Sequence, residues 1–120
     1  MSTITDKGQP TISVNDFLKV EMRIGKIVKV EEFPEARKPA YKLWIDLGPI
    51  GIKKSSAQIT SLYTTKELVD KLVVAVTNFP ARQIADFVSE VLVLGVPFGS
   101  EGSVALIYPE RSVPLGARIL

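Results

Sequence analysis

The sequence predicts a mainly β domain with a few short helices, and three observations support this prediction. Residues 41–47 alternate between apolar and polar side chains, which is the period of a half-buried strand. Residues 72–77 form a short, nearly continuous apolar run, as in a buried strand. Between the predicted strands lies a short helix that begins at a capping box at Thr64. A length of 120 residues, with 46% hydrophobic and 23% charged residues, fits one domain with a modest core.

The first residues form an expected lead-in followed by a short helix. Residues 1–14 are largely polar and contain Gly8 and Pro10, so we expect them to be flexible. Asn15 or Asp16 is expected to cap a helix that runs to Val20, because either side chain can accept a hydrogen bond from a free main-chain N–H group. The folded domain is then expected to occupy residues 15–120.

Two strands are expected next, over residues 23–32 and 41–47. In the first, Ile24, Val28 and Val30 alternate onto one face, and a glycine near its start permits the coiling of a small barrel. In the second, the apolar positions point inward and Trp44 points outward. An outward tryptophan could be a stacking platform or part of a dimer interface. We expect the interface.

The segment from Gly51 to Thr60 is the candidate ligand-binding strand. Ile52 and Ile59 are apolar, but the residues between them are two lysines, two serines, an alanine and a glutamine, where a core strand would carry branched apolar side chains. Small hydroxyl side chains let a ligand approach the backbone, and the lysines supply positive charge. The segment therefore indicates a shallow anion-binding groove. The alternative is a solvated edge strand.

The rest of the chain supplies further strands and an apolar tail. After the helix, which ends near Lys71, strands are expected over residues 72–77, 88–94 and 104–108, with a glycine-containing hairpin loop at 95–102. This order is that of an oligonucleotide/oligosaccharide-binding (OB) barrel. The tail, residues 113–120, is apolar, and a dimer that buries it together with the N-terminal helix would explain why.

Composition excludes several classes of site. The chain has no histidine and no cysteine, which excludes a zinc site, a Ser-His-Asp triad, a thiol nucleophile and a disulfide framework. We expect no metal, no cofactor and no enzymatic activity. No apolar run approaches a membrane span and no signal pattern is evident, so the expected compartment is the cytoplasm. The net charge is only +2, but residues 19–54 carry nine basic against five acidic residues, which indicates a one-sided basic surface.

Four segments together resemble a known family: 35–43 (EARKPAYKL), 51–60 (GIKKSSAQIT), 78–84 (NFPARQI) and 89–95 (SEVLVLG). They are similar to the tRNA-binding domain shared by CsaA-type secretion chaperones, small bacterial tRNA-binding proteins and the C-terminal extension of methionyl-tRNA synthetases. The CsaA-type proteins are the nearest of these. The resemblance covers about residues 16 to 120. It departs at Ala81, where the family often has a second proline.

The resemblance implies a homodimer of five-stranded OB-fold barrels with terminal extensions. It leaves two ligand classes open, namely tRNA and unfolded or precursor polypeptides, with the export machinery as a further partner; one groove could serve both. The predicted nucleic-acid contacts are Arg37, Lys38, Lys42, Lys53, Lys54, Ser55, Ser56, Gln58 and Asn78. The predicted peptide contacts are Ala57, Phe79, Pro80 and Ser89.

Overall fold

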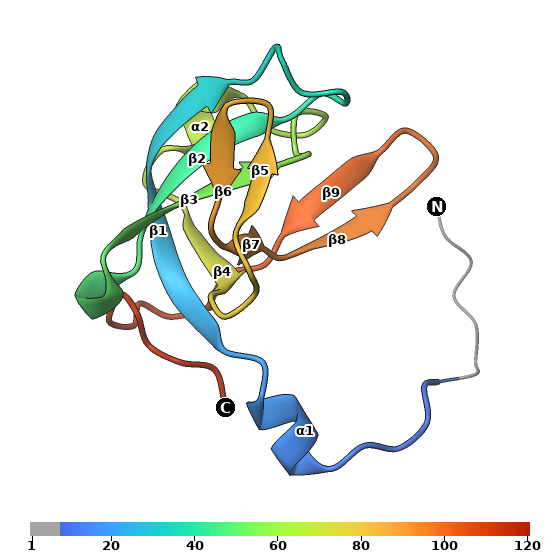
Figure 1. Ribbon diagram of the computed structural model, residues 1–120, viewed down its shortest axis with the longest axis vertical. Coiled ribbons are helices and arrows are strands. Elements are labelled where there is room, and N and C mark those ends of the chain that lie inside the picture. Colours follow the sequence, from blue (N-terminus) through green and yellow to red (C-terminus); the bar gives the residue numbers. More distant parts are fainter. Residues whose placement is uncertain (1–7) are drawn as a thin grey trace.

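A five-stranded antiparallel sheet, coiled into a nearly closed barrel, forms the centre of the molecule (Figure 1). The structure is a computed structural model and describes residues 8–120. The strand order is β3-β2-β1-β4-β7. The prediction of a mainly β barrel with short helices is confirmed. The five strands are β1 (Met22–Glu32), β2 (Tyr41–Asp46), β3 (Ile52–Ala57), β4 (Leu72–Val76) and β7 (Leu92–Val93).

Two small hairpins are added to the barrel, and both differ from the sequence prediction. β5 (Arg82–Ile84) pairs with β6 (Phe87–Ser89), so the strand predicted over residues 88–94 is in fact split between β6 and β7. The tight turn of this hairpin is made by Ala85 at φ 53°, a position that no glycine marks in the sequence. β8 (Gly95–Phe98) pairs with β9 (Ser103–Leu106), so the predicted loop over residues 95–102 is half strand.

A β-bulge in β1 changes which side chains face the core. The pairing of β1 with β2 shifts register between Ile27 and Lys29. Ile27 is therefore fully buried, Val28 is 39% exposed, and Val30 returns to pack against the core. The prediction that Ile24, Val28 and Val30 share one face was wrong, because an extra residue in one strand reverses the alternation beyond it.

The core lies inside the barrel. Leu43, Ile45 and Leu47 are fully buried there, as their alternation predicts. Tyr41 is also buried, and its hydroxyl donates a hydrogen bond to the main-chain oxygen of Tyr63 at 2.8 Å. Burial disfavours the charged phenolate and raises the pKa of Tyr41, so the hydroxyl stays a neutral donor.

Three short helices accompany the barrel within the described residues. In α2 (Thr65–Leu68), the predicted capping box at Thr64 is present, with the Glu67 carboxylate accepting from the Thr64 N–H group at 2.7 Å. A one-turn 3-10 helix spans Gly48–Ile50. α1 (Val14–Leu18) is capped by Ser13 and not, as predicted, by Asn15 or Asp16; Asp16 is instead the third residue of that capping box. The first half of the predicted lead-in (residues 1–14), namely residues 1–7, lies outside the described residues.

The C-terminal tail lies along β1. Main-chain hydrogen bonds join Ile24 to Gly116 and Ala117 at 2.7 and 2.9 Å, and Ile119 to Met22 at 2.8 Å. At Gly116, φ is +88°, and a Cβ there would lie 2.4 Å from the Leu47 main-chain oxygen, so only glycine allows this approach. Part of the apolar tail is therefore covered within the chain.

Candidate functional site

The candidate site is a cleft of about 880 Å³, called the groove below. Its lining residues come from the β5–β6 and β8–β9 hairpins and from the loop that joins β1 to β2. Its walls also include the end of β3 and the whole of β7. Its lining includes Arg37, Lys38, Ser56, Ala57, Gln58, Ile59, Arg82, Ile84, Leu92, Val93 and Val104.

The groove collects five of the predicted contacts. Arg37 and Lys38 come from the β1–β2 loop, Ser56 and Ala57 come from the end of β3, and Gln58 directly follows it. Sequence reasoning missed the opposite wall, which is formed by Arg82, Ile84, β7 and Val104. The sequence predicts a strand over the residues of β7, but it does not show that this strand lies across from β3.

The chemistry of the groove combines an aliphatic floor with a basic rim. Much of the floor is aliphatic and comes from Ile59, Ile84, Leu92 and Val93, and within residues 8–120 the lining of the groove includes no aromatic side chain. Three cations line the rim, and the described lining contains no carboxylate side chain; the cations are Arg37, Lys38 and Arg82. A second space of about 380 Å³ shares Lys38, Gln58 and Val104 with the groove and extends it towards Phe98.

A second surface, called the lysine face below, lies on the outer side of β1, β2 and β3. Lys29, Lys42 and Lys54 come from these three strands, and each ammonium group lies over an aromatic ring. Lys29 is 4.5 Å from the centre of the Trp44 ring. Lys42 and Lys54 are 5.6 and 5.3 Å from the ring of Phe87. Each of these contacts is a cation–π attraction, and the Lys29 ammonium group also forms an ion pair with the Glu31 carboxylate at 3.1 Å.

The aromatic rings of the lysine face form a small cluster of their own. Phe87, carried by the β5–β6 hairpin, packs edge-to-face on Phe33 and on Trp44 at centroid distances of 5.5 and 5.7 Å. Trp44 is thus on the outer face, as predicted, and is partly covered by the chain's own hairpin. Ala36, Ala40 and Ile84 belong both to this cluster and to the lining of the groove, so the two surfaces adjoin.

The two neighbouring lysines of β3 lie on opposite faces. Lys54 pairs across from Trp44 on the outer face, whereas Lys53 pairs across from Ile45, whose side chain is in the core. Lys53 instead reaches a small space at the barrel end that Glu21 and Glu90 also line. The predicted set therefore contains two lysines of the lysine face, Lys42 and Lys54, whereas Lys53 lies apart from it.

Ser55 and Ser89 have structural roles. Ser55 is fully buried, and its hydroxyl donates to the main-chain oxygen of Ser56 at 3.1 Å, so no ligand reaches it. The hydroxyl oxygen of Ser89 accepts a hydrogen bond from the Ser56 N–H group at 3.0 Å. The predicted pair Phe79 and Pro80 is exposed but does not line the groove.

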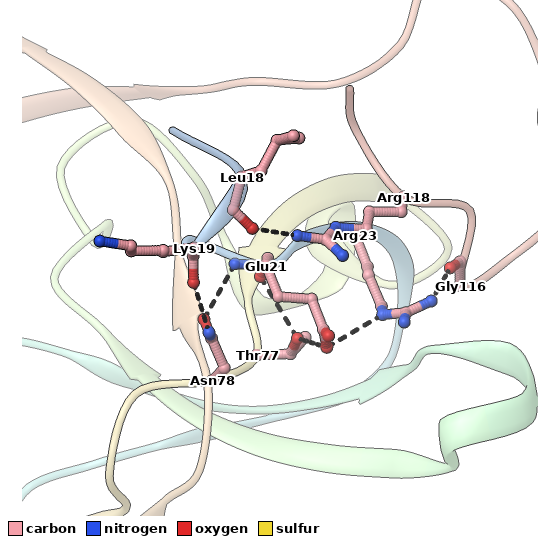
Figure 2. A network of polar contacts seen from close by, with 8 residues as sticks. All are labelled: Leu18, Lys19, Glu21, Arg23, Thr77, Asn78, Gly116 and Arg118. Atoms are coloured by element: carbon pink, nitrogen blue, oxygen red, sulfur yellow. Dashed lines mark hydrogen bonds and ion pairs between the residues drawn. The ribbon is translucent and has the colours of Figure 1, made fainter. Parts of the chain in front are cut away.

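Asn78, one of the predicted nucleic-acid contacts, lies at the junction of α1 with β1 and is not part of the groove lining. Figure 2 shows its amide between two main-chain groups. Oδ1 accepts from the Glu21 N–H group at 2.9 Å, and Nδ2 donates to the Lys19 oxygen at 2.7 Å. Arg118, from the tail, donates to the Leu18 oxygen at 2.5 Å. These bonds fix the end of α1 against the tail and β4.

The carboxylate of Glu21 is the charged centre of the same network (Figure 2). The Thr77 hydroxyl donates to it, and Arg23 Nε lies 3.1 Å away. Both interactions favour the ionised form, with the Thr77 hydrogen bond the larger cause, and they hold the pKa of Glu21 below its ordinary value. Arg23 also donates to the Gly116 oxygen at 2.7 Å.

Residues 8–120 also lack two other kinds of feature. That part of the chain has no group of three or more Asp and Glu side chains placed to hold a metal ion. Nor is any of its helices of sufficient length and apolar character to cross a membrane.

Comparison with known proteins gives a consistent assignment. Residues 22–118 match the family described as "Putative tRNA binding domain". The methionine–tRNA ligase of Pelodictyon phaeoclathratiforme is 39% identical over 92% of this chain, and that of Pyrococcus furiosus is 34% identical over 90%. This chain spans only 15% and 14% of the lengths of those two relatives.

Solved structures of two chaperones are similar over nearly the whole chain. The chaperone CsaA of Bacillus anthracis has a TM-score of 0.86 and 45% identity, and the CsaA chaperone of Picrophilus torridus has a TM-score of 0.84 and 49% identity. Each comparison covers 92% of this chain and 100% of the other.

Proposed function

The chain belongs to the family of tRNA-binding domains, and from this membership we propose that it binds tRNA through the lysine face. The observation that carries the proposal is the convergence of Lys29, Lys42 and Lys54 on one outer surface. Nucleic-acid affinity comes largely from neutralising phosphates and releasing their counterions, so a cluster of fixed cations is the feature such a surface needs.

The neighbouring loop extends this basic surface. Arg37 and Lys38 are exposed on the β1–β2 loop, next to the aromatic cluster. In the proposed complex the three lysines track the phosphates, and the loop cations contact the backbone beside them. Contacts of this kind position the protein on folded RNA without reading a sequence. Because the proposed ligand is tRNA, we also propose that the protein acts in the cytoplasm.

A second function is proposed on a different observation, the aliphatic floor of the groove. A floor built from Ile59, Ile84, Leu92 and Val93 suits apolar side chains of an unfolded or precursor polypeptide. The similar CsaA structures are described as chaperones. We therefore propose a chaperone activity beside RNA binding, with a role in protein export and its machinery as the corresponding partner.

We also propose that the protein forms a homodimer. Ile12, Val14 and Leu18, in and beside α1, are exposed, although the network around Asn78 holds the end of this helix in a fixed place. Leu120 at the tail is exposed as well. Apolar side chains held rigidly in water are typical of an interface. Sedimentation of the protein, with Val14→Ser as the variant, tests this: loss of the dimer supports the proposed surface.

Titration with bulk tRNA at two salt concentrations tests the main proposal. Binding is expected at low salt and should weaken steeply as salt rises. Lys54→Ala is expected to bind more weakly, whereas Lys66→Ala, on the exposed side of α2, serves as the matched control. If tRNA does not bind at low salt, or if both variants bind like the unaltered protein, the proposal is wrong.

A further inference from the structure

A separate pocket lies between the start of α2, the start of β4 and the chain that follows β9. Its volume is about 380 Å³. That value is near the lower end of the range for sites that hold a small ligand, about 300–1,000 Å³. The lining consists of Tyr63, Lys71, Leu72, Leu106 and the segment 108–112. Within the described chain, it shares no residue with the groove or with the lysine face.

One wall of this pocket is fixed by hydrogen bonds. The Tyr63 hydroxyl accepts from the Leu106 N–H group at 3.0 Å, and the Tyr63 main-chain oxygen accepts from the Tyr41 hydroxyl at 2.8 Å. The main-chain oxygen of Lys71 accepts from the Ile27 N–H group of β1 at 2.9 Å. The ring of Tyr63 and the backbone of Lys71 are therefore tied to the barrel and form a preorganised surface.

The other wall carries an exposed aromatic ring. Tyr108 is 68% exposed, more than any other aromatic side chain of residues 8–120. Residues 108–112 form no main-chain hydrogen bonds, so this segment can adjust to a ligand. The pocket thus offers two aromatic rings, one fixed and one adjustable, and such rings favour the flat face of another ring system.

The charges of the lining suit an anion. Lys71 and Arg111 are two exposed cations, against Glu110 as the one carboxylate side chain of the described lining. Glu110 is paired with Arg111 at 3.2 Å, but both side chains are almost fully exposed, so water and salt weaken this pair. Arg111 can therefore turn to a phosphate, and the Glu110 carboxylate can accept a hydrogen bond from the amino group of a base. The Lys71 ammonium group lies 6.0 Å from the centre of the Tyr63 ring, so charge and ring are neighbours.

We propose that this pocket binds a nucleotide, with its base against the rings of Tyr63 and Tyr108 and its phosphate at Lys71 and Arg111. Stacking on aromatic rings and contact of phosphates with cations are the two interactions by which proteins hold unpaired nucleotides. An apolar ligand would leave the cations unused, and inorganic phosphate would leave the rings unused. The nucleotide is either a free mononucleotide or an unpaired nucleotide of an RNA. The inference goes beyond the proposed function, because the pocket is separate from the lysine face.

The test is a titration of the whole, ¹⁵N-labelled chain with adenosine monophosphate (AMP), followed by NMR. The amides of Tyr63, Lys71 and Tyr108 are expected to shift with one common dissociation constant. Ribose phosphate lacks the base and should bind about fivefold or more weakly. Adenosine lacks the phosphate and should bind more weakly than AMP at low salt. If AMP shifts no amide of the pocket, or if either fragment binds as well as AMP, the proposal is wrong.

Tyr108→Ala is the main variant, because so exposed a side chain can be removed without unfolding the barrel. It should weaken AMP binding by about fivefold or more. Arg111→Ala should weaken it at low salt and have less effect at high salt. Phe98→Ala removes an exposed aromatic side chain outside the pocket and serves as the matched control, with AMP binding unchanged. Unchanged AMP binding by Tyr108→Ala would overturn the proposal.

Bulk tRNA, added to the AMP complex, separates the two sources of the nucleotide. Displacement of AMP from the pocket supports an unpaired nucleotide of RNA, and retention of AMP supports a free mononucleotide. Lys54→Ala should bind AMP like the unaltered protein, because Lys54 lies on the lysine face. A failure of the proposed tRNA surface and a failure of this pocket therefore give different results.

Discussion

Lys54 and Glu90 are joined by reciprocal hydrogen bonds across the edge of the barrel. The Glu90 carboxylate accepts from the Lys54 N–H group at 3.0 Å, and the Glu90 N–H group donates to the Lys54 oxygen at 2.7 Å. A side chain therefore takes the place of a neighbouring strand at this point. The same residue, Lys54, carries an ammonium group of the lysine face, so barrel closure and the basic surface share one position.

Glu90→Ala is expected to destabilise the protein by about 1–2 kcal/mol, because it removes an acceptor of a partly buried N–H group. Glu90→Gln keeps an acceptor oxygen and should retain most of the stability. Urea unfolding of the two variants measures the difference. If the two variants lose the same amount, the hydrogen bond is not the cause.

Lys54→Ala and Lys53→Ala should differ in their effect on tRNA. Lys54 lies on the lysine face, and Lys53 lies on the inner face near Glu21 and Glu90. Loss of one phosphate contact lowers the slope of log affinity against log salt by about 0.7–1. We expect that change for Lys54→Ala and a smaller one for Lys53→Ala, in filter binding over a series of salt concentrations. Equal slopes would place the RNA elsewhere.

Asn78→Ala should loosen the junction between α1 and β1. It removes two hydrogen bonds, to Lys19 and to Glu21, at an expected cost of about 1 kcal/mol because the site is exposed. Hydrogen exchange should become faster in residues 14–21 and remain unchanged in β2. Asn15→Ala, at an exposed position of the same helix, is the matched control. Unchanged exchange in Asn78→Ala would show that the tail alone holds α1.

The Glu21 network predicts loss of stability in acid. The pKa of Glu21 is lower in the folded protein than in the unfolded chain, so its contribution is fully present above the unfolded pKa. The contribution is lost as pH falls through the folded pKa. The unaltered protein should therefore exceed Glu21→Gln in urea midpoint at pH 7, and this difference should shrink towards pH 3. A difference that does not change with pH would contradict the assignment.

The sequence was sufficient where one local rule decides the outcome. The alternation in β2 placed Leu43, Ile45 and Leu47 in the core, and the capping box placed the start of α2. The sequence was not sufficient where the pairing of strands determines the structure. The bulge after Ile27 depends on the register of β1 against β2. The turn at Ala85 has a positive φ, which an alanine does not lead one to expect.

The candidate site shows the same division. The β3 segment is basic and polar, and the alternation of a strand already sends Lys53 and Lys54 to opposite faces. Strand pairing, however, decides which of the two lysines is on the outer face. From the sequence, the Asn78 amide could bond either a ligand or main-chain groups. The position of α1 determines that it bonds the main chain of Lys19 and Glu21. The wall formed by Arg82 and Val104 brings together residues that are distant in sequence, which no local pattern contains.

Trp44, the one tryptophan of the chain, lies between the Lys29 ammonium group and the Phe87 ring. An indole's fluorescence responds to charge beside it, and the proposed RNA complex would draw Lys29 towards a phosphate. The protein thus carries an optical probe inside the lysine face. Emission from Trp44 can follow the arrival of RNA in real time, without any attached dye.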